Sequence, residues 1–310
     1  MARKPGLSTA LGQRLLQPKL DALSGAGGQR PSGALAVLTA STGTPGSHPI
    51  APSTTSPSMP DPHRQRLDLL DRAAAAAVEH RFDEAARLAH QVLTRTPGCL
   101  VALRVLAWAQ LQLGEERALD TFQRCAEFDP EDALAEVGQA IWHQQRNRDA
   151  DAVAHWTRAW ELDPHNQPIR RALVRLTGEL PDSDLAEGIS LLRVGRCDEA
   201  AEVLRHVHGI DPSKIAASLG LLTAWRVLRA YAQANRLALE VHSLAPTCVK
   251  GLLYVAAIEE SQGRTLRGRE LLSRAEQADP GLVLFGDLAR ELFPLPETTR
   301  ASRPALASAR

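Results

Sequence analysis

The chain has 310 residues, of which 44% are hydrophobic and 4% aromatic, and its 36 basic side chains balance its 36 acidic ones. This balance argues against binding to nucleic acid or to a charged membrane surface, and no apolar run approaches the roughly 18 residues that span a bilayer. The composition predicts a soluble chain with one large core or two modest ones.

The four cysteines lie far apart in the sequence and form no Cys-x-x-Cys pair. We expect them to be reduced, buried thiols, as is typical of a reducing compartment, and we predict a cytoplasmic protein. The alanine- and arginine-rich, lysine-poor composition further indicates a bacterial source with a GC-rich genome.

Residues 1–62 are dominated, from Gly25 onward, by proline, serine, threonine and glycine. Such a segment buries too little apolar surface to offset its ordering entropy, so we predict that it is disordered. Within it, Leu7 to Leu23 could form a weak amphipathic helix, and acidic residues are few. The segment is interpreted either as a plain tail or as a docking peptide, and a transit peptide is a third reading.

From Arg66 onward the apolar residues recur at helical spacing, and the predicted helices come in pairs. The pairs are Leu67–Val78 with Phe82–Arg95, Val101–Leu113 with Glu115–Phe128, Ala133–Gln145 with Asp149–Leu162, Leu185–Arg193 with Asp198–His208, Ile215–Leu228 with Tyr231–Leu244, and Val249–Ser261 with Leu266–Gln277. A proline closes each pair, at Pro97, Pro130, Pro164, Pro212, Pro246 and Pro280. Successive closing prolines are 33 or 34 residues apart, except for an interval of 48 between Pro164 and Pro212. A fixed period near 34 made of two helices indicates a helical repeat array.

The longer interval adds residues 165–178, which we predict to hold a single helix, Ile169–Leu176. A second single helix, Leu282–Leu292, is predicted after the last pair. An odd helix after three pairs can cap their exposed apolar face, which predicts two similar units, residues 63–180 and 181–296. Residues 297–310 show no periodicity and are predicted to be a disordered tail.

Each second helix carries a small residue twelve positions before its closing proline. These residues are Ala85, Ala118, Ala152, Ala200, Ala234 and Gly268. A glycine marks the turn inside three pairs and is missing from the other three, whose turns we expect to be degenerate. The glycines are Gly114, Gly195 and Gly263, and the positions without one lie near His80, Asn147 and Arg229.

This pattern resembles the tetratricopeptide repeat family, from about Arg66 to Pro296. The resemblance implies an all-α fold, a right-handed α-solenoid of about six antiparallel helix pairs with single capping helices. It also implies that the first helices line a concave groove where a peptide or partner helix binds.

The first helices supply the predicted partner-binding residues of this groove. They are Arg104, Trp108, Arg193, Arg226, Lys250 and Tyr254. Their mixture of aromatic and basic side chains suits an amphipathic or acidic peptide, although ordinary packing or solvated residues could give the same pattern. As a further hypothesis, Leu7 to Leu23 folds back into the groove of its own chain.

The sequence contains no Gly-x-x-x-x-Gly-Lys phosphate loop and no Gly-x-Ser-x-Gly elbow. His206 and His208 are two residues apart and so point to different faces of a helix, which disfavours a metal site. We predict no catalytic residue, no cofactor and no metal.

The predicted function is that of a protein–protein interaction scaffold or a chaperone-like adaptor. The alternative is a non-catalytic, substrate-recruiting subunit of an enzyme or secretion complex. Both functions require a protein or peptide partner, and neither involves nucleic acid or a membrane span.

Overall fold

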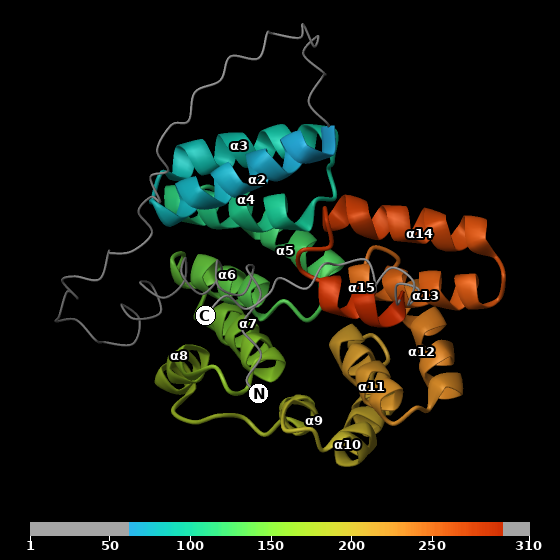
Figure 1. The fold of residues 1–310 in the computed structure, drawn as a ribbon. Coiled ribbons are helices and arrows are strands. Elements are labelled where there is room, and N and C mark those ends of the chain that lie inside the picture. The colour runs from blue at the N-terminus through green and yellow to red at the C-terminus, as the bar shows by residue number, and fades with distance from the viewer. Residues whose placement is uncertain (1–61, 294–310) are drawn as a thin grey trace, which may run out of the picture.

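The structure is a computed structural model and describes residues 62–293. This range contains 14 helices and no strand (Figure 1). Twelve of them form six antiparallel pairs: α2 (Pro62–Val78) with α3 (Phe82–Arg95), α4 (Leu100–Leu113) with α5 (Ala118–Phe128), α6 (Ala133–Gln144) with α7 (Asp149–Leu162), α9 (Asp184–Arg193) with α10 (Cys197–Ile210), α11 (Ile215–Val227) with α12 (Tyr231–Leu244), and α13 (Val249–Ser261) with α14 (Thr265–Ala278). The single helices are α8 (Gln167–Thr177) and α15 (Gly286–Leu292). The predicted all-α array of six antiparallel helix pairs with two single helices is confirmed.

All six pairs share one turn. In each, a backbone N–H donates to the carbonyl five residues earlier, as Glu115 does to Gln110 over 2.9 Å. The residue before this donor has a left-handed backbone, with φ of 76° at Gly114 and 57° to 60° at His80, Asn147 and Arg229. The three turns without glycine therefore have the same geometry as the other three. The hydrogen bond that ends the helix imposes a left-handed backbone even on residues with a Cβ, for which this conformation is unfavourable.

Two predicted helix starts are wrong because hydrogen bonds place those residues in turns. Glu115 belongs to the shared turn, so α5 begins at Ala118. The buried carboxylate of Asp279 accepts hydrogen bonds from the backbone N–H groups of Val283, Leu284 and Phe285, over 2.8 to 3.0 Å. This cap holds residues 280–285 in a compact turn, and α15 begins only at Gly286.

Small residues let the paired helices approach closely. The five predicted alanines and Gly268 are all buried, and large side chains such as Phe122, Trp156 and Leu204 fill the space beside them. The four cysteines are buried and form no disulfide, and burial raises the pKa of Cys99 to about 11. The Cys99 thiol is therefore a packing group with little nucleophilic character at neutral pH.

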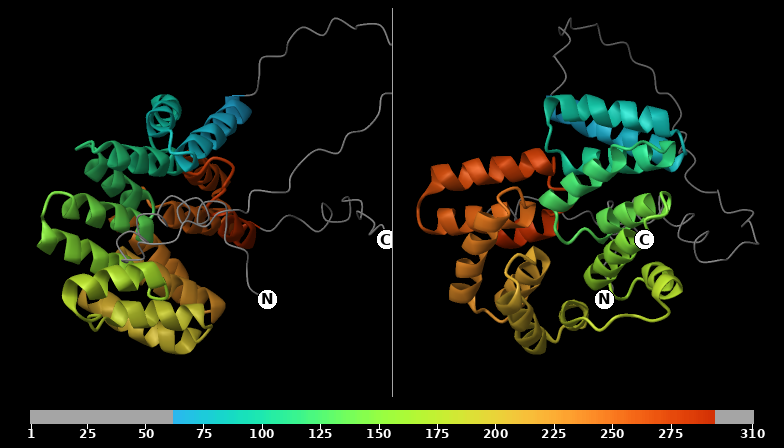
Figure 2. Two further views of the ribbon diagram at one scale, coloured as in Figure 1. Left: turned by 90° about the vertical axis from the view of Figure 1, so that its left-hand side faces the viewer. Right: turned by 180° about the vertical axis from the view of Figure 1, so that it is seen from behind.

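The array curls until its last pair meets the end of α5 and the turn between α5 and α6, and Figures 1 and 2 show the result as a ring of helices. Residues as distant in sequence as Leu103, Trp156 and Leu253 belong to one apolar cluster. The hydroxyl of Thr247, before α13, donates to the backbone carbonyl of Glu127 at the end of α5, over 3.1 Å. Closure of the ring is thus made by both apolar and polar contacts.

No helix within residues 62–293 is both long and apolar enough to cross a bilayer. The predicted Leu7 to Leu23 helix and the predicted tail at 297–310 lie outside the described residues. The division of the array near residue 181 stays a prediction.

Two glycines, one packed between α5 and α6 and the other on an open face of α10, should respond differently to replacement by alanine. A Cβ on Gly138 would overlap the ring of Phe122, which is 1% exposed, so Gly138→Ala should lower the free energy of unfolding by about 1–3 kcal/mol. Gly209 in α10 has no atom within 4 Å of its Cβ position, so Gly209→Ala should be neutral or stabilising by about 0.5 kcal/mol. Urea unfolding of both variants tests this, and equal effects would contradict the described packing.

Candidate functional site

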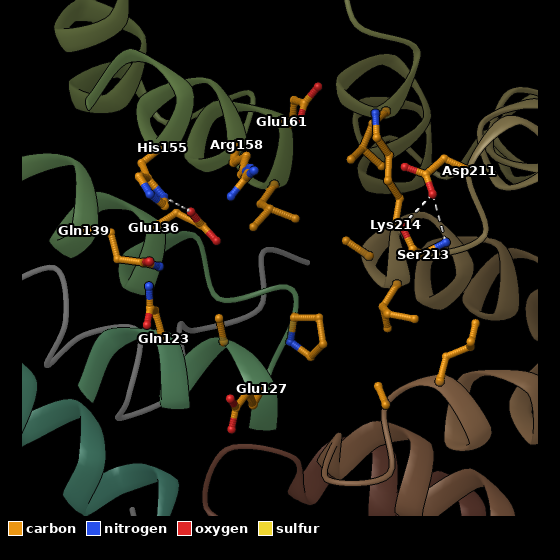
Figure 3. Close-up of a pocket in the computed structure, with 18 of the residues that line it drawn as sticks. Gln123, Glu127, Glu136, Gln139, His155, Arg158, Glu161, Asp211, Ser213 and Lys214 are labelled. Atoms are coloured by element: carbon orange, nitrogen blue, oxygen red, sulfur yellow. Dashed lines mark hydrogen bonds and ion pairs between the residues drawn. The ribbon is translucent and has the colours of Figure 1, made fainter. Parts of the chain in front are cut away.

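The ring surrounds a cavity with a volume of 1290 Å³ (Figure 3). One wall is formed by α5, α6 and α7. The other is formed by the start of α9, the turn between α10 and α11, the start of α11 and the turn between α12 and α13. The walls come from both halves of the chain, so the cavity exists only because the array closes.

A histidine–glutamate pair lies on the first wall. His155 Nδ1 on α7 lies 2.7 Å from Glu136 Oε2 on α6, and the labelled side chains in Figure 3 show this pair beside Gln139 and Gln123. The ring of His143 stacks on the ring of His155, with 5.2 Å between the ring centroids and 13° between the ring planes. Burial and the neighbouring His155 lower the pKa of His143, so His143 is neutral near pH 7.

The cavity carries more acidic than basic groups. Its carboxylates are Glu127, Glu136, Glu161 and Asp211, and its cations are Arg158 and Lys214. The side chains of Glu127, Arg158 and Lys214 make no hydrogen bond or ion pair with another residue in the described range. These groups are therefore available to a bound molecule.

Asp211 is held in place by the turn that carries it. Its carboxylate accepts from the backbone N–H of Ser213 over 3.0 Å and from the Ser213 hydroxyl over 2.5 Å. The hydrogen bond from the Ser213 hydroxyl holds the pKa of Asp211 below its usual range. This carboxylate thus adds a fixed negative charge to the second wall.

Two ion-pair groups meet at the turn between α5 and α6 beside the cavity, and we call them the clasp. Lys250 of α13 pairs with Glu131 and closes the ring, and Arg104 of α4 pairs with Asp129 and Asp132 of the same turn. Arg104 lies 2.9 Å from Asp129 and 2.7 Å from Asp132, and Lys250 on α13 reaches Glu131 in the turn between α5 and α6. Burial alone would lower the pKa of Lys250, but Glu131 and Asp129 outweigh it and raise that pKa. The clasp cations therefore stay charged, and neither lines the cavity.

The six residues predicted for the groove occupy four different settings. Arg104 and Lys250 belong to the clasp. Arg226 lies 3.1 Å from Glu291 of α15, with its guanidinium 5.3 Å from the centre of the Tyr254 ring. Trp108 is 4% exposed and packs edge-on against Phe122, while Arg193 stands apart in an ion pair with Asp163 at 2.6 Å.

None of these six residues lines the cavity. The cavity residues that the sequence analysis missed lie on second helices, such as His155 and Arg158, and in the turns after closing prolines, such as Lys214. The only sequence signal for the turns is their repeated position after each proline. No periodic pattern shows that distant repeats meet face to face.

Within residues 62–293, no three histidine, cysteine or acidic side chains are arranged to hold a metal ion. His206 and His208 have separate partners: Asp184 lies 4.0 Å from His206, and the hydroxyl of Ser218 lies 2.9 Å from His208.

Neither a protein-family model nor a curated protein matches the sequence. Among solved structures, a mutant of MamA is 17% identical and has a TM-score of 0.33, with 59% of this chain and 99% of that chain covered. The pilF protein of Pseudomonas aeruginosa is 13% identical and has a TM-score of 0.33, with 74% of this chain and all of that chain covered. These TM-scores are too low to support an argument about function.

The clasp predicts a loss of stability when one partner is removed. Lys250→Met leaves Glu131, whose side chain is 19% exposed, without its cation, and should lower the free energy of unfolding by about 1–3 kcal/mol. Arg196→Met breaks a pair in which both partners are more than half exposed, and should cost less than about 0.5 kcal/mol. Urea unfolding compares the two, and equal losses would show that the clasp does not support the ring.

The stacked histidines predict an acid-sensitive stability. Because the folded state resists protonation of His143, the unfolded chain binds that proton more readily, so stability falls as the pH drops below about 6.5. In the His143→Gln variant, Tm should decrease less between pH 7 and pH 5.5 than it does in the unchanged protein. The control is His206→Gln, at a side chain that is 67% exposed, and it should leave the fall unchanged. A full-sized fall in His143→Gln would assign the acid sensitivity to other groups.

Proposed function

We propose that this chain is a non-catalytic adaptor that binds a segment of a partner protein in the cavity at the centre of its closed ring. The observation that carries the proposal is the cavity itself. Its 1290 Å³ exceeds the roughly 300–1,000 Å³ of typical small-molecule pockets and suits a peptide segment or one face of a helix.

The lining favours a partner segment that combines apolar and basic side chains. Ala126, Leu162, Leu185, Ile215 and Leu244 provide apolar contact area on both walls. The four carboxylates outnumber the two cations, which favours lysine or arginine at the edges of the segment. The acidic ligand expected from the sequence loses its support, because the clasp cations and Arg226 already face carboxylates of this chain.

Buried, unpaired thiols support a reducing compartment such as the cytoplasm for this adaptor. A chaperone-like role and a substrate-recruiting role in a larger complex would both use the same cavity. They differ in whether the bound segment is later released or presented to a catalytic subunit.

The proposal is tested with two fluorescein-labelled peptides that share one leucine spacing, one carrying lysines and the other glutamates. Fluorescence anisotropy with the full chain should show tighter binding of the lysine peptide. Combined Glu127→Gln and Glu161→Gln should raise its Kd roughly tenfold, which corresponds to about 1.4 kcal/mol. The control Glu202→Gln, at an exposed position on α10 away from the cavity, should leave the Kd unchanged.

Two results would contradict the proposed function. One is equal affinity for the two peptides. The other is a Kd that does not respond to the change at Glu127 and Glu161.

A further inference from the structure

The cavity has binding groups on both walls that the described residues leave without partners. Glu127 on α5 and Arg158 on α7 form no side-chain bond, and Gln139 on α6 is 3% exposed with no side-chain hydrogen bond to a described residue. An occupant with a polar group near Gln139 would gain a hydrogen bond to this amide. The same occupant would meet the excess of carboxylates described above.

Residues 3–23 of this chain have the complementary chemistry. Four basic residues accompany a single acidic one, Asp21: they are Arg3, Lys4, Arg14 and Lys19. Leucines recur at positions 7, 11, 15, 16, 20 and 23, a spacing compatible with the weak helix expected from the sequence, which Gly12 and Pro18 interrupt. A basic, leucine-rich segment is the kind of ligand that an apolar cavity with acidic edges favours.

The chain is long enough to bring this segment to the cavity. Residues 24–61 connect it to Pro62, where α2 begins. Thirty-eight residues extend to at most about 125 Å, whereas a domain of roughly 230 residues has a radius of gyration near 17 Å. Every opening of the cavity therefore lies within reach of the segment.

We propose that residues 3–23 occupy the central cavity as an intramolecular ligand and compete there with the partner segment. This inference rests on the proposed function, because both ligands use the same acidic, partly apolar walls. A tethered competitor acts at a high effective concentration and lowers the apparent affinity for a free peptide. Partner binding would then require displacement of the chain's own segment.

Photo-crosslinking in the full chain tests the occupancy. A benzophenone amino acid replaces Ala154 on one wall or Lys214 on the other, both of which are exposed positions that line the cavity. The control is the same replacement at Arg87, an exposed position on α3 outside the cavity. We expect products of monomer mass whose digests link positions 154 and 214 to residues 3–23, with at least fivefold less from position 87.

Three crosslinking results would overturn the inference. Equal yields at all positions would mean non-specific contact. A product of dimer mass would identify a second copy as the occupant, and the absence of any product with residues 3–23 would mean that the segment does not enter the cavity.

A charge reversal separates this inference from the proposed function. Arg14→Glu with Lys19→Glu should lower the crosslink yield at position 154 at least threefold and should lower the Kd for the lysine peptide at least threefold. If the Kd of that peptide responds to Glu127→Gln with Glu161→Gln but no crosslink to residues 3–23 forms, the inference is overturned and the proposed function stands. A crosslink together with no peptide binding, even after charge reversal, would overturn the proposed function alone.

Discussion

The hydrogen bond that ends the first helix of each pair is the constraint on which the array depends. In all six turns an N–H reaches the carbonyl five residues back, and the residue before it takes a left-handed backbone. This bond therefore gives every pair the same kind of connection between its two helices. Side chains at His80, Asn147 and Arg229 tolerate the strained conformation because losing the bond would leave helix carbonyls unsatisfied.

Repetition of one turn makes a curved stack, and the curvature brings the two ends of the stack together. The clasp and the shared apolar cluster then bind α13 to the turn between α5 and α6. The apolar cluster excludes water, the ion pair of Lys250 with Glu131 joins α13 to this turn, and Arg104 holds the same turn through Asp129 and Asp132. The cavity is the space that this closure leaves at the centre.

The helix pairs could be predicted from the sequence because their determinants are local. The small residue at Ala118, the proline at Pro130 and the apolar spacing between them lie within one repeat. The start of α15 could not be predicted, since it depends on the Asp279 side chain reaching three N–H groups in a turn. The contact of Lys250 with Glu131 could not be predicted either, because 119 residues separate them and the repeat period carries no information about that contact. The predicted groove residues therefore include two that belong to the clasp, whereas the cavity walls use other residues of first and second helices and of the turns between pairs.

Ring closure changes the order in which this array is expected to fold and unfold. In a linear stack, each repeat touches only its neighbours, so the outermost repeats open first and the rest follow one by one. Here the last pair is bound to the end of α5 and to the turn after it, so fraying of the last repeat removes contacts from the second pair as well. A ribosome must also have released residues beyond Lys250 before the walls of the cavity can meet. Until then, the nascent chain presents an open, acidic surface, and its ability to hold a ligand begins only with the synthesis of its last repeat.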